Sequence, residues 1–100
     1  GEQVEFISTD YFNSLNLFRN YLYKEKGLYP NLKGALKSVY PSRMSKQMSN
    51  GMMAYEYTMG KQANNKDLIN IFDYVDKTKY KDLTSVSDQL EYFKAWVKSL

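Results

Sequence analysis

The sequence contains no cysteine and no histidine. Their absence excludes disulfides, thiolate and imidazole metal sites, the cysteine nucleophile and the commonest general base. A carboxylate pair remains, because Asp73 and Asp76 stand three residues apart on one helical face. Lysines are interleaved with these carboxylates, which favours a solvated, salt-bridged surface. We therefore expect a non-enzymatic protein that needs no metal and no other cofactor.

Proline and glycine are scarce, with two and five residues, which excludes collagen-like and linker compositions. Aromatic residues make up 16% of the chain, enough to build a core and to argue against intrinsic disorder. A chain of 100 residues rarely divides its core in two. We predict a single domain over residues 1–100, either whole or as a piece of a larger protein.

Long apolar runs are also missing, since the longest stretches have two or three residues, as in Met52-Met53-Ala54. No segment has the length of a membrane span or of a signal-peptide core. The lack of cysteine agrees with a reducing compartment. The sequence therefore predicts a cytoplasmic chain without membrane contact.

Acidic residues are absent from the middle of the chain. Residues 26–55 carry five basic side chains and no acidic one, whereas the flanking segments are mildly acidic or neutral. The formal net charge of +3 arises from this window. A window of one sign attracts an anionic partner over about one Debye length, roughly 8 Å at physiological salt.

Apolar periodicity predicts helices over nearly the whole chain. After an extended arm at Val4–Ile7, the polar cluster at Ser8–Asp10 caps a first helix over about 10–25. A second, short helix follows Pro30 and ends at Pro41, because a proline disfavours helical geometry in the residue before it.

A third helix is predicted from Ser42 to about Gly60, along a stripe of methionines. Gly51 interrupts this helix, so either the helix breaks there or another backbone approaches closely. A fourth helix follows a cap at Asn65, and a fifth follows a cap at Ser85 and runs to the chain end.

These periodicities together predict an all-α fold, a compact bundle of about five short helices. Its core is expected to contain the residues on the repeated apolar faces, which are Leu15, Phe18, Leu22, Leu36, Val39, Leu68, Ile71, Phe72, Leu90 and Phe93.

The second and third predicted helices, over about residues 30–60, resemble a helix-turn-helix pair in the acid-free window. In such a pair the second helix enters the DNA major groove. We therefore predict a double-stranded DNA-binding domain. Phosphate contacts are expected from Lys33, Lys37, Arg43 and Lys46, and base contacts from Gln47 and Asn50.

Two alternatives compete with DNA binding. Methionines and tyrosines suit an adaptable protein-binding surface, as in an adaptor or inhibitor, although both residue types also fill cores. The methionine stripe consists of Met44, Met48, Met52, Met53 and Met59, four of which share one helical face. A self-associating domain would instead bury the fifth helix in a homodimer, through Phe93, Trp96 and Val97.

Overall fold

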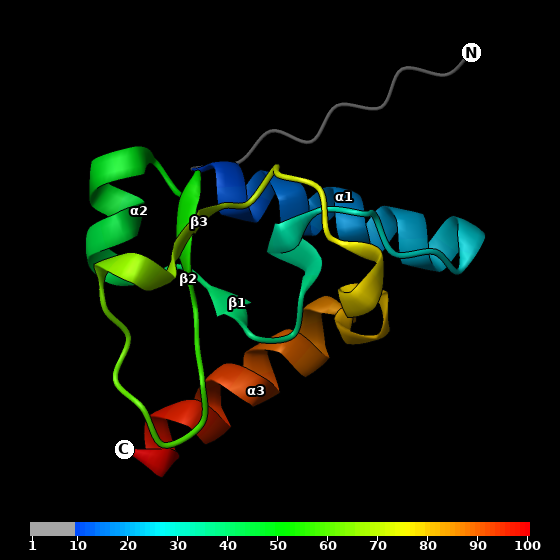
Figure 1. Cartoon of the computed structure of the whole chain (residues 1–100). Coiled ribbons are helices and arrows are strands. Elements are labelled where there is room, and N and C mark those ends of the chain that lie inside the picture. The colour runs from blue at the N-terminus through cyan, green and yellow to red at the C-terminus, as the bar shows by residue number, and fades with distance from the viewer. Residues whose placement is uncertain (1–9) are drawn as a thin grey trace.

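The computed structural model describes residues 10–100, which form a mixed α/β fold (Figure 1). Its α-helices are α1 (Tyr11–Lys26), α2 (Arg43–Ser49) and α3 (Val86–Ser99). Three 3₁₀ helices are η1 (Lys33–Ala35), η2 (Asn65–Asp67) and η3 (Lys77–Asp82). The strands β1 (Val39–Tyr40), β2 (Met53–Glu56) and β3 (Leu68–Asn70) form one antiparallel sheet in the order β1-β2-β3. The predicted all-α bundle of five helices is therefore wrong.

The first and last predicted helices are confirmed, and both are stabilised by local caps. The Asp10 carboxylate accepts a hydrogen bond of 2.7 Å from the backbone N–H of Asn13 at the start of α1. Gly27 ends α1 in the left-handed conformation, with φ of 65°. The Ser85 hydroxyl accepts from the backbone N–H of Asp88 at the start of α3. The extended arm predicted at Val4–Ile7 lies outside the described residues.

The predicted second helix does not form, because its backbone bonds elsewhere. The N–H groups of Lys33 and Gly34 donate to the carbonyls of Asp73 and Ile71, at 2.8 and 2.9 Å. Gly34 also lies so close to its neighbours that a Cβ atom there would be 2.5 Å from Leu15 Cδ2. Tertiary contacts thus override helix propensity and leave only η1 and β1.

The predicted third helix ends at Ser49 rather than at Gly60. Asn50 and Gly51 take left-handed conformations, with φ of 54° and 82°, which an α-helix cannot continue. A Cβ atom at Gly51 would lie 3.0 Å from the backbone nitrogen of Phe12. Both alternatives for Gly51 therefore hold, since the helix breaks there and another backbone approaches closely.

The predicted fourth helix is replaced by η2 and β3. Once residues after Gly51 extend as β2, they offer a backbone edge with which Leu68–Asn70 pairs. Ala54 faces Ile69 in that pairing, and Tyr40 of β1 faces Tyr55 on the other side of β2. Figure 1 shows α2 beside this sheet and α3 running past β1.

The core contains many of the expected residues. Leu15, Leu36, Val39 and Ile71 are buried together with Phe12, Ala54 and Val75. Phe18, Leu22, Leu68, Leu90 and Phe93 are only partly buried. Phe72 is 41% exposed, so its assignment to the core is wrong, because the chain turns after β3 and points this ring outward while the adjacent Ile71 faces inward.

A polar cluster fastens α1 to η1 and to the start of α3. The buried guanidinium of Arg19 donates to the carbonyls of Gly34 and Thr84, at 3.1 and 2.9 Å, and to the side chain of Gln89. Burial lowers the pKa of Arg19 to about 10, so the group stays protonated at neutral pH.

Within residues 10–100, none of the helices combines the length and the apolar character that crossing a bilayer requires.

Candidate interaction surface

Serine side chains cap α2 and link it to β2 by hydrogen bonds. Ser42 and Ser45 form a reciprocal capping box, in which each hydroxyl accepts from the backbone N–H of the other at 2.9 to 3.0 Å. The Ser49 hydroxyl donates to the carbonyl of Ser45 at 2.6 Å and accepts from the N–H of Met53 at 3.0 Å. The last turn of α2 is therefore linked directly to the first residue of β2.

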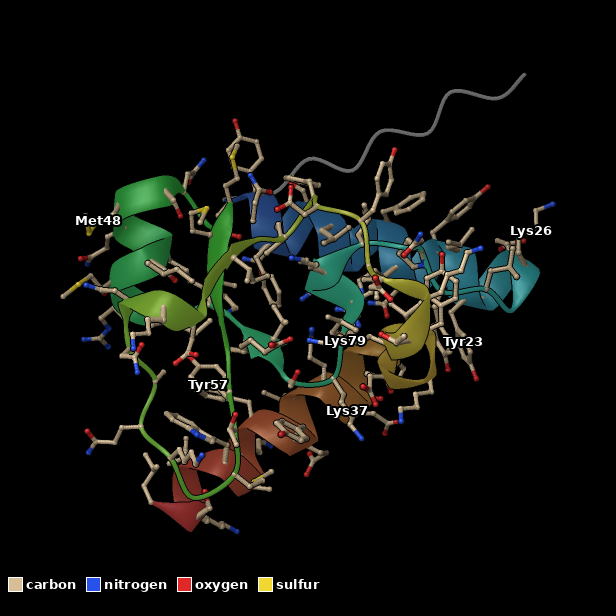
Figure 2. All side chains as sticks on the ribbon, viewed as in Figure 1. Tyr23, Lys26, Lys37, Met48, Tyr57 and Lys79 are labelled. Atoms are coloured by element: carbon tan, nitrogen blue, oxygen red, sulfur yellow. The ribbon has the colours of Figure 1, made fainter. Side chains whose placement is uncertain are left out.

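The two methionines of α2 lie on one exposed face. Met44 and Met48 are separated by four residues, which places them one above the other on a helix. They are 64% and 81% exposed. Figure 2 shows Met48 pointing away from the body of the molecule. These side chains do not serve the core in the described structure.

A cavity of about 410 Å³ lies next to these methionines, between α2 and the strands β2 and β3. We call it the methionine groove. Its lining residues are Met44, Ser45, Met48, Ser49, Met53, Tyr55, Asn65 and Leu68. The groove therefore combines flexible thioether side chains with an aromatic ring and a leucine.

A second cavity of about 520 Å³ adjoins the first, because Met44 and Tyr55 line both. We call it the aromatic hollow. Its lining residues are Ser42, Arg43, Met44, Tyr55, Tyr57, Gln62, Ala63, Phe93, Trp96 and Leu100. Together the two cavities extend from β3 to the last turn of α3.

The aromatic hollow is lined by rings that belong to a larger cluster of packed aromatic side chains. The ring centroids of Tyr57 and Trp96 lie 4.1 Å apart, and those of Tyr40 and Phe93 lie 4.5 Å apart. The indole N–H of Trp96 donates to the carbonyl of Lys61 at 2.8 Å. Burial raises the pKa of Tyr57 to about 12, so its hydroxyl is neutral at physiological pH.

The six residues predicted to contact DNA are divided between two regions. Arg43, Lys46 and Gln47 lie on α2, and Asn50 follows as its C-cap. Their spacing of three, four and seven residues places these four on one side of the helix, next to the methionine face. Lys33 starts η1, where it is partly buried.

Lys37 lies apart from α2. Its ammonium pairs with the carboxylate of Asp82 at 3.6 Å, and Lys79 pairs nearby with Glu56 at 3.5 Å. Figure 2 shows Lys37 and Lys79 close together and well away from Met48. The structure therefore brings four of the six predicted residues together. It does not form the predicted helix-turn-helix pair, because the segment before α2 is η1 and β1 rather than a helix.

The walls of the cavities include residues that the sequence did not single out as one site. Met53, Tyr55 and Leu68 meet because β2 and β3 pair with Tyr55 opposite Leu68. The sequence signals for this surface were the methionine stripe, which includes Met44 and Met48, and the abundance of tyrosines. Phe93 and Trp96, proposed for a dimer face, are partly buried in the ring cluster, whereas Val97 is exposed.

The described part of the chain, residues 10–100, holds no group of three or more acidic side chains arranged to bind a metal ion. The chain matches no protein-family profile and no curated protein sequence.

Proposed function

We propose that this chain is a protein-interaction module that binds an apolar segment of a partner protein in the methionine groove. The observation that carries the proposal is the exposure of Met44 and Met48 at the lip of a cavity. Single exposed apolar side chains are common, but a contiguous apolar patch marks interaction sites. Unbranched, polarisable methionines repack around partners of different shape.

The contacts that hold this surface together favour binding as well. Ser49 links α2 to β2 through two hydrogen bonds, and the ring of Tyr57, which lines the adjoining hollow, packs against Trp96. A surface that such contacts already hold in shape loses less entropy when a partner is bound. The packed elements α2 and β2 therefore give the surface its shape, and the methionine side chains adapt to the partner.

DNA binding stays a prediction from the sequence. Fewer structural observations support it than support the binding of a partner protein in the methionine groove. It depended on a helix-turn-helix pair and on four basic side chains acting together. The first of these two helices is replaced by η1 and β1, and Lys37 is occupied by Asp82. The protein-partner alternative depends only on side chains that the fold leaves exposed beside a cavity.

Panning a library of short random peptides on the 100-residue chain tests the proposal. We expect enriched peptides to bind the wild-type chain and to lose at least about tenfold in affinity for Met48→Glu, because a charge would enter an apolar contact. Tyr74→Glu is the matched control, since Tyr74 is 79% exposed but lines neither cavity. Equal losses in both variants, or no enriched peptide, would contradict the proposal.

A salt titration with duplex DNA separates the two functions. The groove proposal predicts no duplex binding that depends on the basic residues. If DNA is the partner, four phosphate contacts give a slope of log K against log salt of about −3.6, and Arg43→Ala makes it shallower by about 0.9. That result would favour the DNA hypothesis over the groove.

A further inference from the structure

We infer that the partner segment is acidic and carries two bulky apolar side chains, one for the methionine groove and one for the aromatic hollow. This inference rests on the proposed function and specifies the chemistry of the partner. It follows from two observations, the charge of the segments that frame the cavities and the wall that the cavities share.

The segments that frame the cavities carry more positive than negative charge. Residues 42–56 form α2 and β2, and residues 57–67 lead from β2 through η2. Their basic side chains are Arg43, Lys46, Lys61 and Lys66, and their acidic side chains are Glu56 and Asp67. Both carboxylates have partners, because Glu56 pairs with Lys79 at 3.5 Å and Asp67 accepts from the N–H of Asn64 at 2.9 Å. The rim of the apolar surface therefore has an excess of positive charge, which favours an anionic partner and speeds its association.

Arg43 brings this charge to the cavity itself. It is the first residue of α2, it is exposed, and it lines the aromatic hollow. Among residues 10–100, no acidic side chain lines either cavity. A guanidinium binds a carboxylate through two parallel hydrogen bonds. A glutamate or aspartate beside the apolar anchor of the partner would find this donor at the edge of the hollow.

The shared wall sets the number of apolar anchors. Met44 and Tyr55 stand between the two cavities and line both. A segment that crosses this wall can place one side chain on each side of it. Apolar anchors that fill neighbouring pockets contribute most of the affinity in helix-in-groove and extended-peptide recognition.

Two other occupants fit these features less well. An anionic lipid surface also attracts basic and apolar residues, but a bilayer is broad, whereas the apolar residues here line cavities of about 410 and 520 Å³. A second copy of the chain would bring two positive rims together, at a cost in like-charge repulsion. A separate acidic segment satisfies both the cavities and the charge.

Fluorescently labelled synthetic peptides test the inference. One set keeps two phenylalanines and changes the intervening positions from glutamate to glutamine or lysine, and a second set keeps glutamate and replaces one phenylalanine with alanine. We expect the glutamate peptide with two phenylalanines to bind at least about tenfold more tightly than the lysine peptide at low salt. We also expect loss of either phenylalanine to weaken binding at least about tenfold.

Charge reversal on the protein provides the reciprocal test. Arg43→Glu, Lys61→Glu and Lys66→Glu change exposed side chains, so the fold is expected to persist. Each change is expected to lower the affinity for the acidic peptide by about two- to fivefold, which is the range for the loss of an exposed ion pair. Lys77→Glu on η3 is the control, because Lys77 is exposed and lines neither cavity. An equal effect of Lys77→Glu would overturn the charge argument.

The two proposals fail in different ways. If panned peptides bind through Met48 but are neutral or basic, the interaction module stands and the acidic partner is overturned. If no peptide binds and Met48→Glu changes nothing, both are overturned. Binding of phosphatidylserine vesicles without binding of any peptide would overturn both in favour of a lipid surface. Sedimentation of the free chain as a dimer that Met48→Glu dissociates would overturn the separate partner.

Discussion

The guanidinium of Arg19 donates a 2.7 Å hydrogen bond to the side-chain oxygen of Gln89, and the two residues are 3% and 0% exposed. The amide nitrogen of Gln89 donates in turn to the carbonyls of Gly34 and Leu36, at 2.8 and 2.9 Å. One glutamine thus accepts a hydrogen bond from a buried cation and satisfies two backbone acceptors. The Nε atom of Arg19 has no hydrogen-bond partner among the described residues, so the cluster has little capacity to absorb a further loss.

Gln89→Leu is expected to lower the free energy of unfolding by about 3 kcal/mol. It removes an acceptor from a buried charge and a donor from two carbonyls. Arg19→Met together with Gln89→Leu is expected to cost at least about 1 kcal/mol less than the sum of the single changes, because both partners then become apolar. Urea unfolding of the three variants measures this coupling. Additive losses would contradict a shared cluster.

Gly34→Ala is expected to destabilise the chain by about 1 to 3 kcal/mol, the usual cost of overpacking. A methyl group there would lie 2.5 Å from Leu15 Cδ2 and 2.9 Å from Ile71 Cβ. Leu15→Ala alone costs about 2 to 5 kcal/mol, but it removes one clashing atom. The double variant should therefore lose less stability than the two single changes predict, as thermal unfolding would measure. A Gly34→Ala variant as stable as the wild type would show that η1 is not packed this closely.

Phe12→Ala and Phe72→Ala are expected to lower the free energy of unfolding by very different amounts. Phe12 is buried in the core, and truncating it should cost about 3 to 5 kcal/mol. Phe72 is largely exposed and makes an edge-on ring contact with Tyr11, at 6.1 Å between centroids. Its truncation should cost below about 1.5 kcal/mol. Guanidinium unfolding compares the two, and equal losses would restore Phe72 to the core.

Tyr57 is expected to make the chain sensitive to alkali. Its pKa is raised from 10.0 to about 12 by burial, so the folded state holds the proton that the unfolded state releases between these values. Stability contributed by Tyr57 is thus complete below pH 10 and decreases as the pH rises towards 12. Between about pH 8 and pH 11 the loss should be about 1 kcal/mol.

Tyr57→Phe isolates this effect from the other tyrosines. It should remove about 1 kcal/mol of the pH-dependent loss, measured by urea unfolding at both pH values. Tyr74→Phe, at a largely exposed position, should leave the loss as in the wild type. The same pH dependence in all three proteins would contradict the assignment to Tyr57.

The sequence predicted the elements whose signals are local. α1 and α3 begin at side-chain caps and keep an apolar period over 16 and 14 residues. The strands are two to four residues long, too short for a period, and pairing between segments distant in the chain determines them. The predicted second helix, over Leu32–Val39, does not form for the same reason. The backbone carbonyls of Ile71 and Asp73, which are distant in the chain, accept hydrogen bonds from N–H groups of this segment.

The candidate site was predictable only in part, for a related reason. The exposed pair Met44 and Met48 is visible as a spacing of four, and the acid-free window is visible in the composition. The cavities need Leu68 beside Tyr55 and Trp96 beside Tyr57, which only the fold brings together. The sequence also indicated that a glycine at position 51 would destabilise a helix that continued through it, and the chain does turn there.

The Arg19–Gln89 contact also couples the folding of segments that are distant in the chain. Its partners are 70 residues apart in the chain, so closing this contact costs the entropy of a long loop before it yields any stability. Until α3 docks, Arg19 and the carbonyls of Gly34 and Leu36 lack the glutamine that satisfies them. α1, η1 and α3 therefore gain their stability together, and the chain is expected to fold and unfold as one cooperative unit, without a long-lived state in which α3 alone is detached.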